Sequence, residues 1–416
     1  MSHFRYIRKR LCCEGVRLAE IAEKVGTPAY VYSQSAIEER FREFDRAFAP
    51  MPHLICYAVK ANANLAILSL LRARGAGFDI VSGGELRRVL AARAQPERIV
   101  FSGVGKTLEE VDLGLRHGIL QFNLESEAEL DLLAARAAHL RKEARVGVRV
   151  NPDVDAETHP YHSTGLSEHK FGISCRRASE VLQKAAQMRR LTVTGIGFHI
   201  GSQITRLEPF ISALERLRAL ALELRVRGIV IRHLDLGGGL GIVYADEEPP
   251  EVSAYGRALI DLVKDVGCGI LLEPGRAIVG NAGLLLTRVI RTKDSESKSF
   301  VIVDAAMNDL IRPSLYGAHH RIQHETLARR EARVVDVVGP VCETGDFLAR
   351  DRELPAARAG DLLAVMSAGA YGFVSSSNYN SRTRPAEVLV RGSRFRVIRR
   401  RETFDDLIRG EARRPL

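Results

Sequence analysis

The sequence predicts a TIM-type (β/α)8 barrel followed by a mostly antiparallel β-domain, and three observations lead to this fold class. Eight short apolar runs recur up to about residue 275, and helix-like segments separate them. After about residue 280 the pattern changes to short β-rich runs broken by Gly and Pro. With 416 residues, of which 46% are hydrophobic, the chain is long enough to build two cores.

The eight expected barrel strands follow one another at 54–59, 78–82, 98–103, 119–125, 145–151, 193–201, 232–238 and 269–275. Several of the helical patterns between them open on a Ser, Thr or Asn that is typical of a helix N-cap. A polar residue or a glycine stands at the C-terminal end of each strand: Lys60, Ser82, Ser102, Glu125, Asn151, His199, Gly237 and Glu273. In a (β/α)8 barrel this end is the catalytic face.

The charge pattern does not favour a polyanionic partner. The formal net charge is +10, but the basic residues are spread along the chain and interleaved with Glu and Asp. We therefore expect no nucleic-acid binding. The densest basic stretch, at 394–404, alternates with Val, Ile and Phe, as in an amphipathic strand or helix.

Neither a membrane span nor a signal peptide is expected, because no charge-free apolar run reaches eighteen residues and no apolar segment follows the N-terminal charges. Six cysteines, at 12, 13, 56, 175, 268 and 342, form no C-x-x-C pair. This spacing does not suit a zinc site, so no metal is expected. The spacing of the cysteines also favours the reducing cytoplasm as the location of the protein.

Four separate motifs carry residues suited to one cofactor: YAVKAN at 57–62, HIGSQ at 199–203, EPGR at 273–276 and CETGD at 342–346. Around a pyridoxal phosphate (PLP) they offer a Schiff-base amine, a flat ring, a carboxylate for the pyridine nitrogen and a proton donor, from Lys60, His199, Glu273 and Cys342. Taken singly, Lys60 could be a snorkelling lysine at the barrel mouth, and His199 a core histidine. Together the four residues indicate a decarboxylase.

Two glycine-rich stretches imitate nucleotide-binding motifs. LDLGGGLG at 234–241 lacks the third glycine of a dinucleotide site, because Ile242 stands there, but its three consecutive glycines still let backbone N–H groups approach a phosphate. GVGKT at 103–107 lacks the first glycine of a P-loop, because Val100 occupies that position. We interpret it as a barrel loop.

Further stretches complete the pattern, among them FDIVSGGEL at 78–86, RVNPDVD at 149–155, MNDLIRPSLYGA at 307–318 and SSNYNSRTRPAEVLV at 376–390. With these motifs the chain resembles the diaminopimelate decarboxylase family, of the alanine racemase-like fold group of PLP enzymes. The resemblance covers all but the first dozen or so and the last twenty or so residues. It implies a PLP-binding barrel over 30–278 and a β-domain, of sandwich or barrel-like form, built from 1–29 and 279–416.

The resemblance also implies the cofactor contacts. PLP is expected to be linked to Lys60, with Asp79 and Arg149 supporting that side of the site. Its ring is expected to stack on His199, with Glu273 beside the pyridine nitrogen. The residues implied around the phosphate are Gly237, Gly238, Gly239, Ser202, Gly275, Arg276 and Tyr371.

For the substrate, the resemblance implies that Arg276 and Arg312, with Tyr316, bind the distal carboxylate. It also implies that Glu343 binds the distal amine and that Tyr371 contacts both the substrate and the phosphate. The implied reaction removes CO2 from the D-centre of meso-diaminopimelate and, after protonation by Cys342, gives L-lysine, which is the last step of lysine biosynthesis. Because the family places Cys342 and Glu343 in the neighbouring subunit's site, a homodimer with shared active sites is implied.

Three alternatives remain open. Ornithine- and arginine-type decarboxylases share the fold but lack the Arg276–Arg312 clamp. A racemase would need a different catalytic base and would not need Cys342. An inactive homologue that acts as a binding or regulatory protein would usually have lost the lysine or the cysteine, whereas Lys60 and Cys342 are both present.

Overall fold

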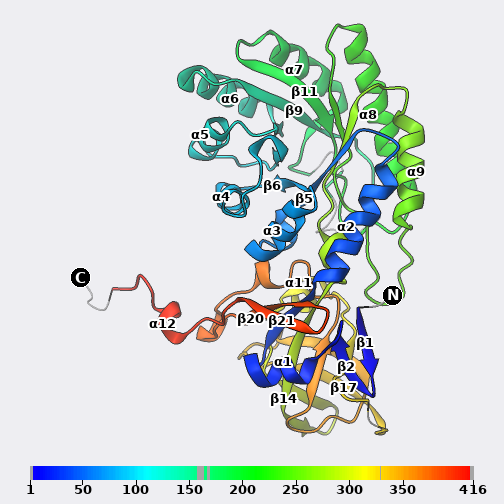
Figure 1. Ribbon diagram of the computed structural model, residues 1–416, viewed down its shortest axis with the longest axis vertical. Coiled ribbons are helices and arrows are strands. Elements are labelled where there is room, and N and C mark those ends of the chain that lie inside the picture. The colour runs from blue at the N-terminus through cyan, green and yellow to red at the C-terminus, as the bar shows by residue number, and fades with distance from the viewer. Residues whose placement is uncertain (1–2, 157–163, 166–168, 328, 413–416) are drawn as a thin grey trace. The chain divides into compact units, whose positions relative to one another are not determined.

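The computed structural model describes residues 3–156, 164–165, 169–327 and 329–412 (Figure 1). The chain separates into two compact units. The barrel unit consists of Glu38–Ile242 and Glu247–Ile278, and the β-unit of Met1–Ile37, Val243–Asp246 and Val279–Leu416.

Eight parallel strands form the barrel: β5 (His53–Ala58), β6 (Gly77–Ile80), β7 (Ile99–Phe101), β8 (Gln121–Leu124), β9 (Ala144–Asn151), β11 (Leu191–Gly197), β12 (His233–Asp235) and β13 (Gly269–Leu272). They pair in this order, and β13 pairs with β5, which closes the circle. The expected fold class is thereby confirmed, with each strand at its expected place. A two-residue strand, β10 (Ile173–Ser174), pairs with β9 and was not expected.

Helices alternate with these strands: α3 (Leu65–Ala73), α4 (Gly83–Ala91), α5 (Leu108–His117), α6 (Glu127–Leu140), α7 (Cys175–Gln187), α8 (Glu208–Val226) and α9 (Val252–Val263) (Figure 1). Helix α2 (Gln34–Phe48) precedes the first barrel strand, and α10 (Arg276–Val279) follows the last. The side chains of Ser82, Thr107 and Ser126 accept hydrogen bonds from backbone N–H groups in the first turns of α4, α5 and α6. These caps fix the loops that follow β6, β7 and β8, and so the rim of the catalytic face.

The β-unit contains a sheet in the order β18 (Phe347–Pro355), β17 (Ala332–Val338), β15 (Ser299–Val303), β14 (Gly283–Asp294), β4 (Ala29–Ser33), β20 (Ala386–Arg391) and β21 (Arg394–Arg399). Strand β14 also pairs with β19 (Leu362–Val365), and β19 with β16 (Ile322–His324). All these pairs are antiparallel except β15–β17 and β20–β4. Residues 30–37, which the resemblance places in the barrel, lie in this unit because β4 pairs with β14 and β20. The basic stretch at 394–404 begins with strand β21.

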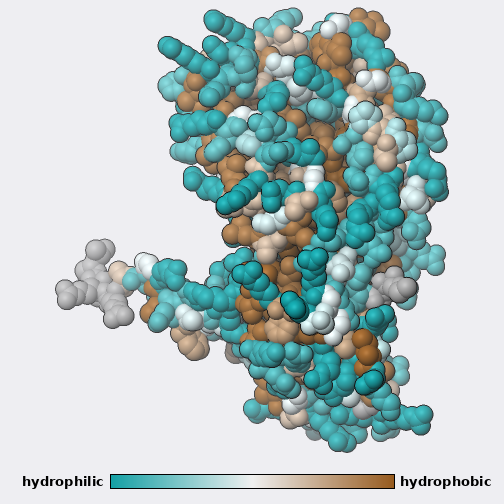
Figure 2. All heavy atoms as spheres, in the orientation of Figure 1, coloured by the Kyte–Doolittle hydropathy of each residue, from teal (hydrophilic) through white to brown (hydrophobic). Residues whose placement is uncertain are grey.

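The N-terminal segment packs on this sheet. It forms β1 (Phe4–Ile7), β2 (Arg10–Cys13), β3 (Val16–Arg17) and α1 (Leu18–Val25), and its Leu11 and Ile21 share a core cluster with Leu284 and Val388. Hydrophilic residues cover much of the visible face of the molecule (Figure 2). Within the described residues, every helix is too short or too polar to cross a bilayer.

Candidate active site

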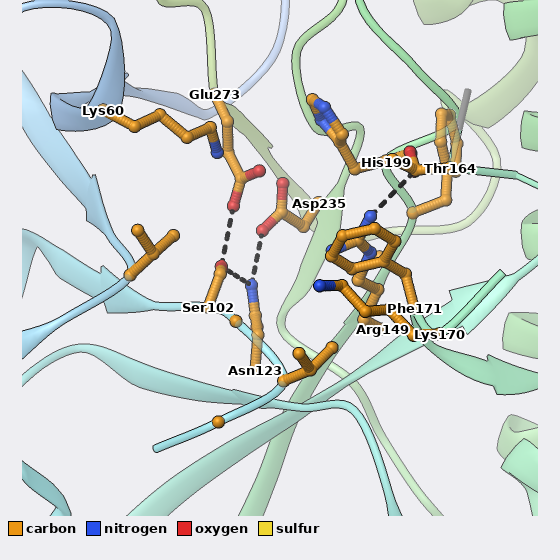
Figure 3. Close-up of a pocket in the computed structure, with 16 residues that line it drawn as sticks. Lys60, Ser102, Asn123, Arg149, Thr164, Lys170, Phe171, His199, Asp235 and Glu273 are labelled. Atoms are coloured by element: carbon orange, nitrogen blue, oxygen red, sulfur yellow. Dashed lines mark hydrogen bonds between the residues drawn. The ribbon is translucent and has the colours of Figure 1, made fainter. Parts of the chain in front are cut away.

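A cavity of about 400 Å³ lies at the C-terminal ends of the barrel strands (Figure 3). Side chains from the ends of most of the strands converge on it, which is the arrangement expected for the catalytic face of this fold. Its lining consists of Lys60, Val81, Ser102, Gly103, Val104, Gly105, Asn123, Arg149, Thr164, Lys170, Phe171, Gly197, Phe198, His199, Asp235 and Glu273.

Lys60 and Asp79 form an ion pair at this cavity. Lys60 lies in a 3-10 turn, η1 (Val59–Ala61), directly after β5, and its Nζ donates to Oδ2 of Asp79 over 2.8 Å. Asp79 is fully buried in β6, and its Oδ1 has no hydrogen-bond partner among the described residues. Because an unmatched buried carboxylate oxygen is costly, Asp79 has spare capacity to accept from a further donor.

Glu273 follows β13 and is buried. The Ser102 hydroxyl donates to its Oε1 over 3.4 Å, and the Asp235 carboxyl group lies beside it in Figure 3. Burial raises the pKa of Glu273 well above its ordinary value, Asp235 and Asp79 raise it further, and Lys60 lowers it. Glu273 therefore holds a proton readily, and in Figure 3 it points towards the same part of the cavity as the Lys60 amine.

His199 presents a neutral ring. The backbone N–H of Gly238 donates to its Nδ1 over 3.2 Å, so Nδ1 is the acceptor and the ring hydrogen belongs on Nε2. Burial lowers the pKa of His199 well below its ordinary value, and the neighbouring cations Lys60 and Arg149 lower it further. An uncharged aromatic surface therefore borders the cavity.

Arg149 forms hydrogen bonds to two segments of the catalytic face. Its guanidinium donates to Oε1 of Glu125 over 3.0 Å and to the carbonyl oxygen of His199 over 3.0 Å. It also lies over the Phe171 ring, 4.7 Å from the centroid. Arg149 therefore links the segment after β8, which carries Glu125, to the segment after β11, which carries His199.

The glycine turn at 237–239 has no room for side chains. A Cβ at Gly237 would lie 2.3 Å from the carbonyl oxygen of Phe198, and one at Gly238 would lie 2.2 Å from that of Glu273. Gly237 and Gly239 also have positive φ angles, of 61° and 105°. The turn is therefore a bare backbone surface beside His199 and Glu273, of the kind that accommodates a phosphate group.

Arg276 and Ser202 form a polar contact at the same end of the barrel. The Nε and a terminal nitrogen of the buried Arg276 lie 3.3 and 3.1 Å from the Ser202 hydroxyl oxygen. Gly275, directly before Arg276, is packed so closely that a Cβ there would lie 2.9 Å from the Cβ of Ala61. The EPGR motif therefore abuts the turn that carries Lys60.

The remaining expected residues belong to the β-unit. Arg312 is buried at the start of α11 (Arg312–Tyr316), where its guanidinium carbon lies 4.6 Å from the centroid of the Tyr244 ring and one of its terminal nitrogens 3.1 Å from His320 Nε2. Tyr316 ends this helix and is half-buried. These contacts hold the Arg312 guanidinium in a fixed orientation.

Cys342, Glu343 and Tyr371 lie in loops of the β-unit. Cys342 is exposed, and its backbone N–H donates to Oδ1 of Asn380 over 2.8 Å. The Tyr379 hydroxyl donates to Glu343 over 3.2 Å. Tyr371 is half-buried and adopts a positive φ of 56°, which is uncommon for a residue with a bulky side chain.

Comparison with known proteins decides the family. A family model described as pyridoxal-dependent decarboxylase, pyridoxal binding domain, matches residues 34–280. A curated diaminopimelate decarboxylase from Pseudomonas aeruginosa is 55% identical over 415 residues, which is 100% of both chains. The chain belongs to the diaminopimelate decarboxylase family.

Solved structures agree with this assignment. A diaminopimelate decarboxylase from Helicobacter pylori complexed with L-lysine is 42% identical with a TM-score of 0.92, covering 94% of this chain and 98% of that one. The family enzyme from M. jannaschii, in co-complex with L-lysine, is 38% identical with a TM-score of 0.94, covering 98% of this chain and 97% of that one.

The cavity of this decarboxylase-family chain fits PLP, the cofactor of the matched family. The turn at 237–239 leaves bare backbone where a phosphate would lie. Glu273 holds a proton that a pyridine nitrogen can share, and Asp79 keeps an oxygen unmatched beside the Lys60 amine. The space at this turn, the Glu273 carboxyl group and the Lys60–Asp79 pair match the phosphate, the ring nitrogen and the carbonyl end of the cofactor.

Sequence reasoning missed one part of the site. Asn123 and Asp235 line the cavity and connect to Glu273, and Gln121 and Thr194 extend their hydrogen-bond network into the barrel. Motif reading passed over them because Asn and Gln have no single chemical role. The available signal was glycine inside strands, at 147, 195 and 197, where a side chain is normally expected.

Proposed function

We propose that the chain decarboxylates meso-diaminopimelate at its D-centre, giving L-lysine and CO2 with PLP as cofactor, as the last step of lysine biosynthesis. The observation that carries the proposal is the convergence of Lys60, Glu273, His199 and the glycine turn on one cavity in a chain 55% identical to a diaminopimelate decarboxylase over its full length. Bound PLP supplies an electron sink for the electron pair that CO2 leaves behind.

Lys60 is the residue whose amine would hold the cofactor until the substrate amine takes its place. Its ion pair with Asp79 aims Nζ at the cavity and offers a nearby negative charge when the nitrogen carries a proton. Arg149 supports this side of the site by holding the loop that carries His199.

Glu273 keeps a proton at the pyridine nitrogen, and its burial excludes water that would compete for that proton. His199 would lie against the ring, and its neutral state would avoid placing a second cation against a protonated pyridine. The residues that would hold the phosphate are the turn at 237–239, Ser202, the backbone of Gly275 and Arg276, and Tyr371.

Specificity rests on recognition of the distal amino-acid end of the substrate. Arg276 and Arg312 offer planar guanidinium forks to the distal carboxylate, with Tyr316 alongside, and Glu343 accepts from the distal ammonium. A substrate with a bare distal amine has no distal carboxylate to offer these two buried arginines.

Cys342 returns a proton to the carbon from which CO2 departs. Its exposure in the β-unit is consistent with a role towards a neighbouring subunit, and we propose a homodimer in which Cys342 and Glu343 complete the partner's site. We also propose a cytoplasmic location, since all six cysteines are free.

Release of CO2 from purified, PLP-loaded protein tests this function. We expect turnover of meso-diaminopimelate and little turnover of ornithine, arginine or L-lysine at equal concentration. Efficient turnover of ornithine would instead indicate a broad basic amino-acid decarboxylase, and turnover of none of the four would favour an inactive homologue. Interconversion of stereoisomers without CO2 release would indicate a racemase.

A further inference from the structure

A line of buried polar side chains leads through the inside of the barrel to Asp235, the neighbour of Glu273. The Thr194 hydroxyl donates to Oε1 of Gln121 over 2.8 Å, and Nε2 of Gln121 donates to Oδ1 of Asn123 over 2.7 Å. Nδ2 of Asn123 then donates to Oδ2 of Asp235 over 3.1 Å. All of these side chains are buried, so the hydrogen bonds are sheltered from water.

The line ends on an Asp235 carboxylate that accepts on both oxygens. Besides the bond from Asn123 to Oδ2, the backbone N–H of Gly237 donates to Oδ1 over 3.0 Å. Two N–H donors favour the ionised form of a carboxyl group. Burial raises the pKa of Asp235, and these two donors oppose that effect. The pKa of Glu273 is raised well above its ordinary value, so Glu273 is the protonated and Asp235 the ionised partner of the pair.

The hydrogen bonds of Ser102 indicate which oxygen of Glu273 carries a proton. Nδ2 of Asn123 donates to the Ser102 hydroxyl oxygen over 3.2 Å, so the Ser102 hydrogen is free to point at Oε1 of Glu273, 3.4 Å away. Oε1 is then an acceptor, and the proton lies on the other oxygen, shared with Asp235. Two adjacent ionised carboxylates in a buried site would repel each other strongly.

Glycines in the barrel strands make room for this line of side chains. A Cβ at Gly197 would lie 2.5 Å from the Cβ of Asp235, and one at Gly147 would lie 2.3 Å from Nε2 of Gln121. Glycine inside a strand lowers the stability of that strand. At these positions it leaves the space that the polar side chains occupy. Asp235 is consequently held in one place, beside Glu273 (Figure 3).

We infer that Asp235 is a positioning residue that keeps a proton on Glu273 and sets how strongly Glu273 binds it. With PLP bound, the Glu273 carboxyl would supply this proton to the pyridine nitrogen. Glu273 would then be the carboxylate that accepts from the ring N–H, and Asp235 would stay ionised, because the positive charge of the protonated ring offsets the repulsion between the two carboxylates. The inference rests on the proposed placement of Glu273 at the ring nitrogen.

The direct test is the nitrogen-15 NMR signal of holoenzyme loaded with PLP labelled at the pyridine nitrogen, because this signal separates protonated from unprotonated pyridine. In Asp235→Asn, which keeps the shape but removes the charge, we expect the signal to move towards the unprotonated position. We expect kcat for diaminopimelate to fall by at least about tenfold, the factor that one pKa unit represents. In Ser102→Ala, which removes a neutral contact to Glu273, we expect the nitrogen signal to stay in place.

The variant Glu273→Gln tests the proposed placement of Glu273 at the ring nitrogen separately from the role of Asp235. If Glu273→Gln shifts the nitrogen signal and Asp235→Asn does not, Glu273 holds the ring but Asp235 has no part in it. If neither variant shifts the signal, the placement of Glu273 itself is wrong. Equal shifts of the nitrogen signal in Asp235→Asn and Ser102→Ala would mean that any change in the hydrogen-bond network shifts the signal. That outcome would also overturn the role of the Asp235 charge.

A second measurement keeps the inference testable should Asp235→Asn fail to fold. PLP-free wild-type protein at neutral pH should show the infrared carbonyl stretch of a protonated, buried carboxyl group. This band should disappear in Glu273→Gln, persist in Ser102→Ala and disappear from wild type when PLP is added. A band that survives in Glu273→Gln, or no such band in wild type, overturns the inference.

Discussion

The ammonium of Lys60 lies 2.8 Å from a fully buried carboxylate oxygen of Asp79, whose second oxygen has no partner among the described residues. This pair joins the turn after β5 to β6 and orients the amine that we propose attaches the cofactor. Two other lysines lie at or near the catalytic face, Lys170 in the cavity wall and Lys106, which is buried against Glu129.

Borohydride reduction of the PLP-loaded protein should fix the cofactor on Lys60. Nζ of Lys60 faces the acceptor that a cofactor-bound amine needs, whereas Nζ of Lys106 already makes three hydrogen bonds. Peptide mass spectrometry identifies the modified residue. Modification of Lys170 or Lys106 in its place would contradict the assignment.

Gly238→Ala should weaken PLP binding by at least about tenfold, because a new Cβ 2.2 Å from the Glu273 carbonyl oxygen must displace the turn or the strand end. Fluorescence titration of the apoprotein with PLP measures the change. Gly84→Ala is the matched control: it lies in α4, where the added Cβ meets nothing closer than 3.7 Å, and it should leave PLP affinity unchanged. Equal affinities for Gly238→Ala and wild type would remove the turn from the cofactor site.

Arg312→Ala should lower kcat/KM for diaminopimelate by about ten- to a few hundred-fold, because loss of one charge-assisted partner typically costs about 1.5–3 kcal/mol. The visible absorption of bound PLP should survive, since Arg312 is assigned to the substrate. Ornithine, which lacks a distal carboxylate, serves as the control substrate, and its low kcat/KM should change little. A similar loss for both substrates would mean that the substitution damages the β-unit and not the clamp.

The stability of the apoprotein should fall more steeply with acidity in wild type than in His199→Asn. The folded-state pKa of His199 is lowered, chiefly by burial. Below about pH 6.5, His199 therefore binds a proton in the unfolded chain but stays neutral in the folded chain. The contribution of His199 is therefore present above pH 6.5 and is lost as the pH falls. Asn removes the titration and can still accept from the Gly238 N–H. Thermal unfolding from pH 5 to 8 measures both profiles, and parallel profiles would contradict the neutral ring.

Mixing two inactive variants should restore partial activity if subunits share sites. Lys60→Ala alters the barrel unit and Cys342→Ala the β-unit, and a mixed dimer would contain one site with both native residues. CO2 release after subunit exchange measures the rescue, with each variant alone as the control. Heterodimers that form without regaining activity would show that each site is built within one chain.

The sequence by itself determined the barrel and pointed to most of the residues that we propose for the active site. Apolar runs of strand length and the caps at Ser82 and Thr107 are local signals, so the strands and the helix starts could be predicted from short windows. Lys60, His199 and Glu273 were identifiable because each stands at a strand end in a distinctive motif, and barrel closure then requires strand ends to meet at one face.

The tertiary structure alone decided how these residues are held. Asn123 reaches Asp235 across 112 positions of sequence, and Ser102 reaches Glu273 across 171. Such partners depend on register between non-adjacent strands and on which side chains turn inwards, and no short window contains that information. The neutral form of His199 likewise follows from the Gly238 N–H, which only the folded turn brings to its Nδ1. Burial then shifts the pKa of both His199 and Glu273, because a low-dielectric interior disfavours their charged forms.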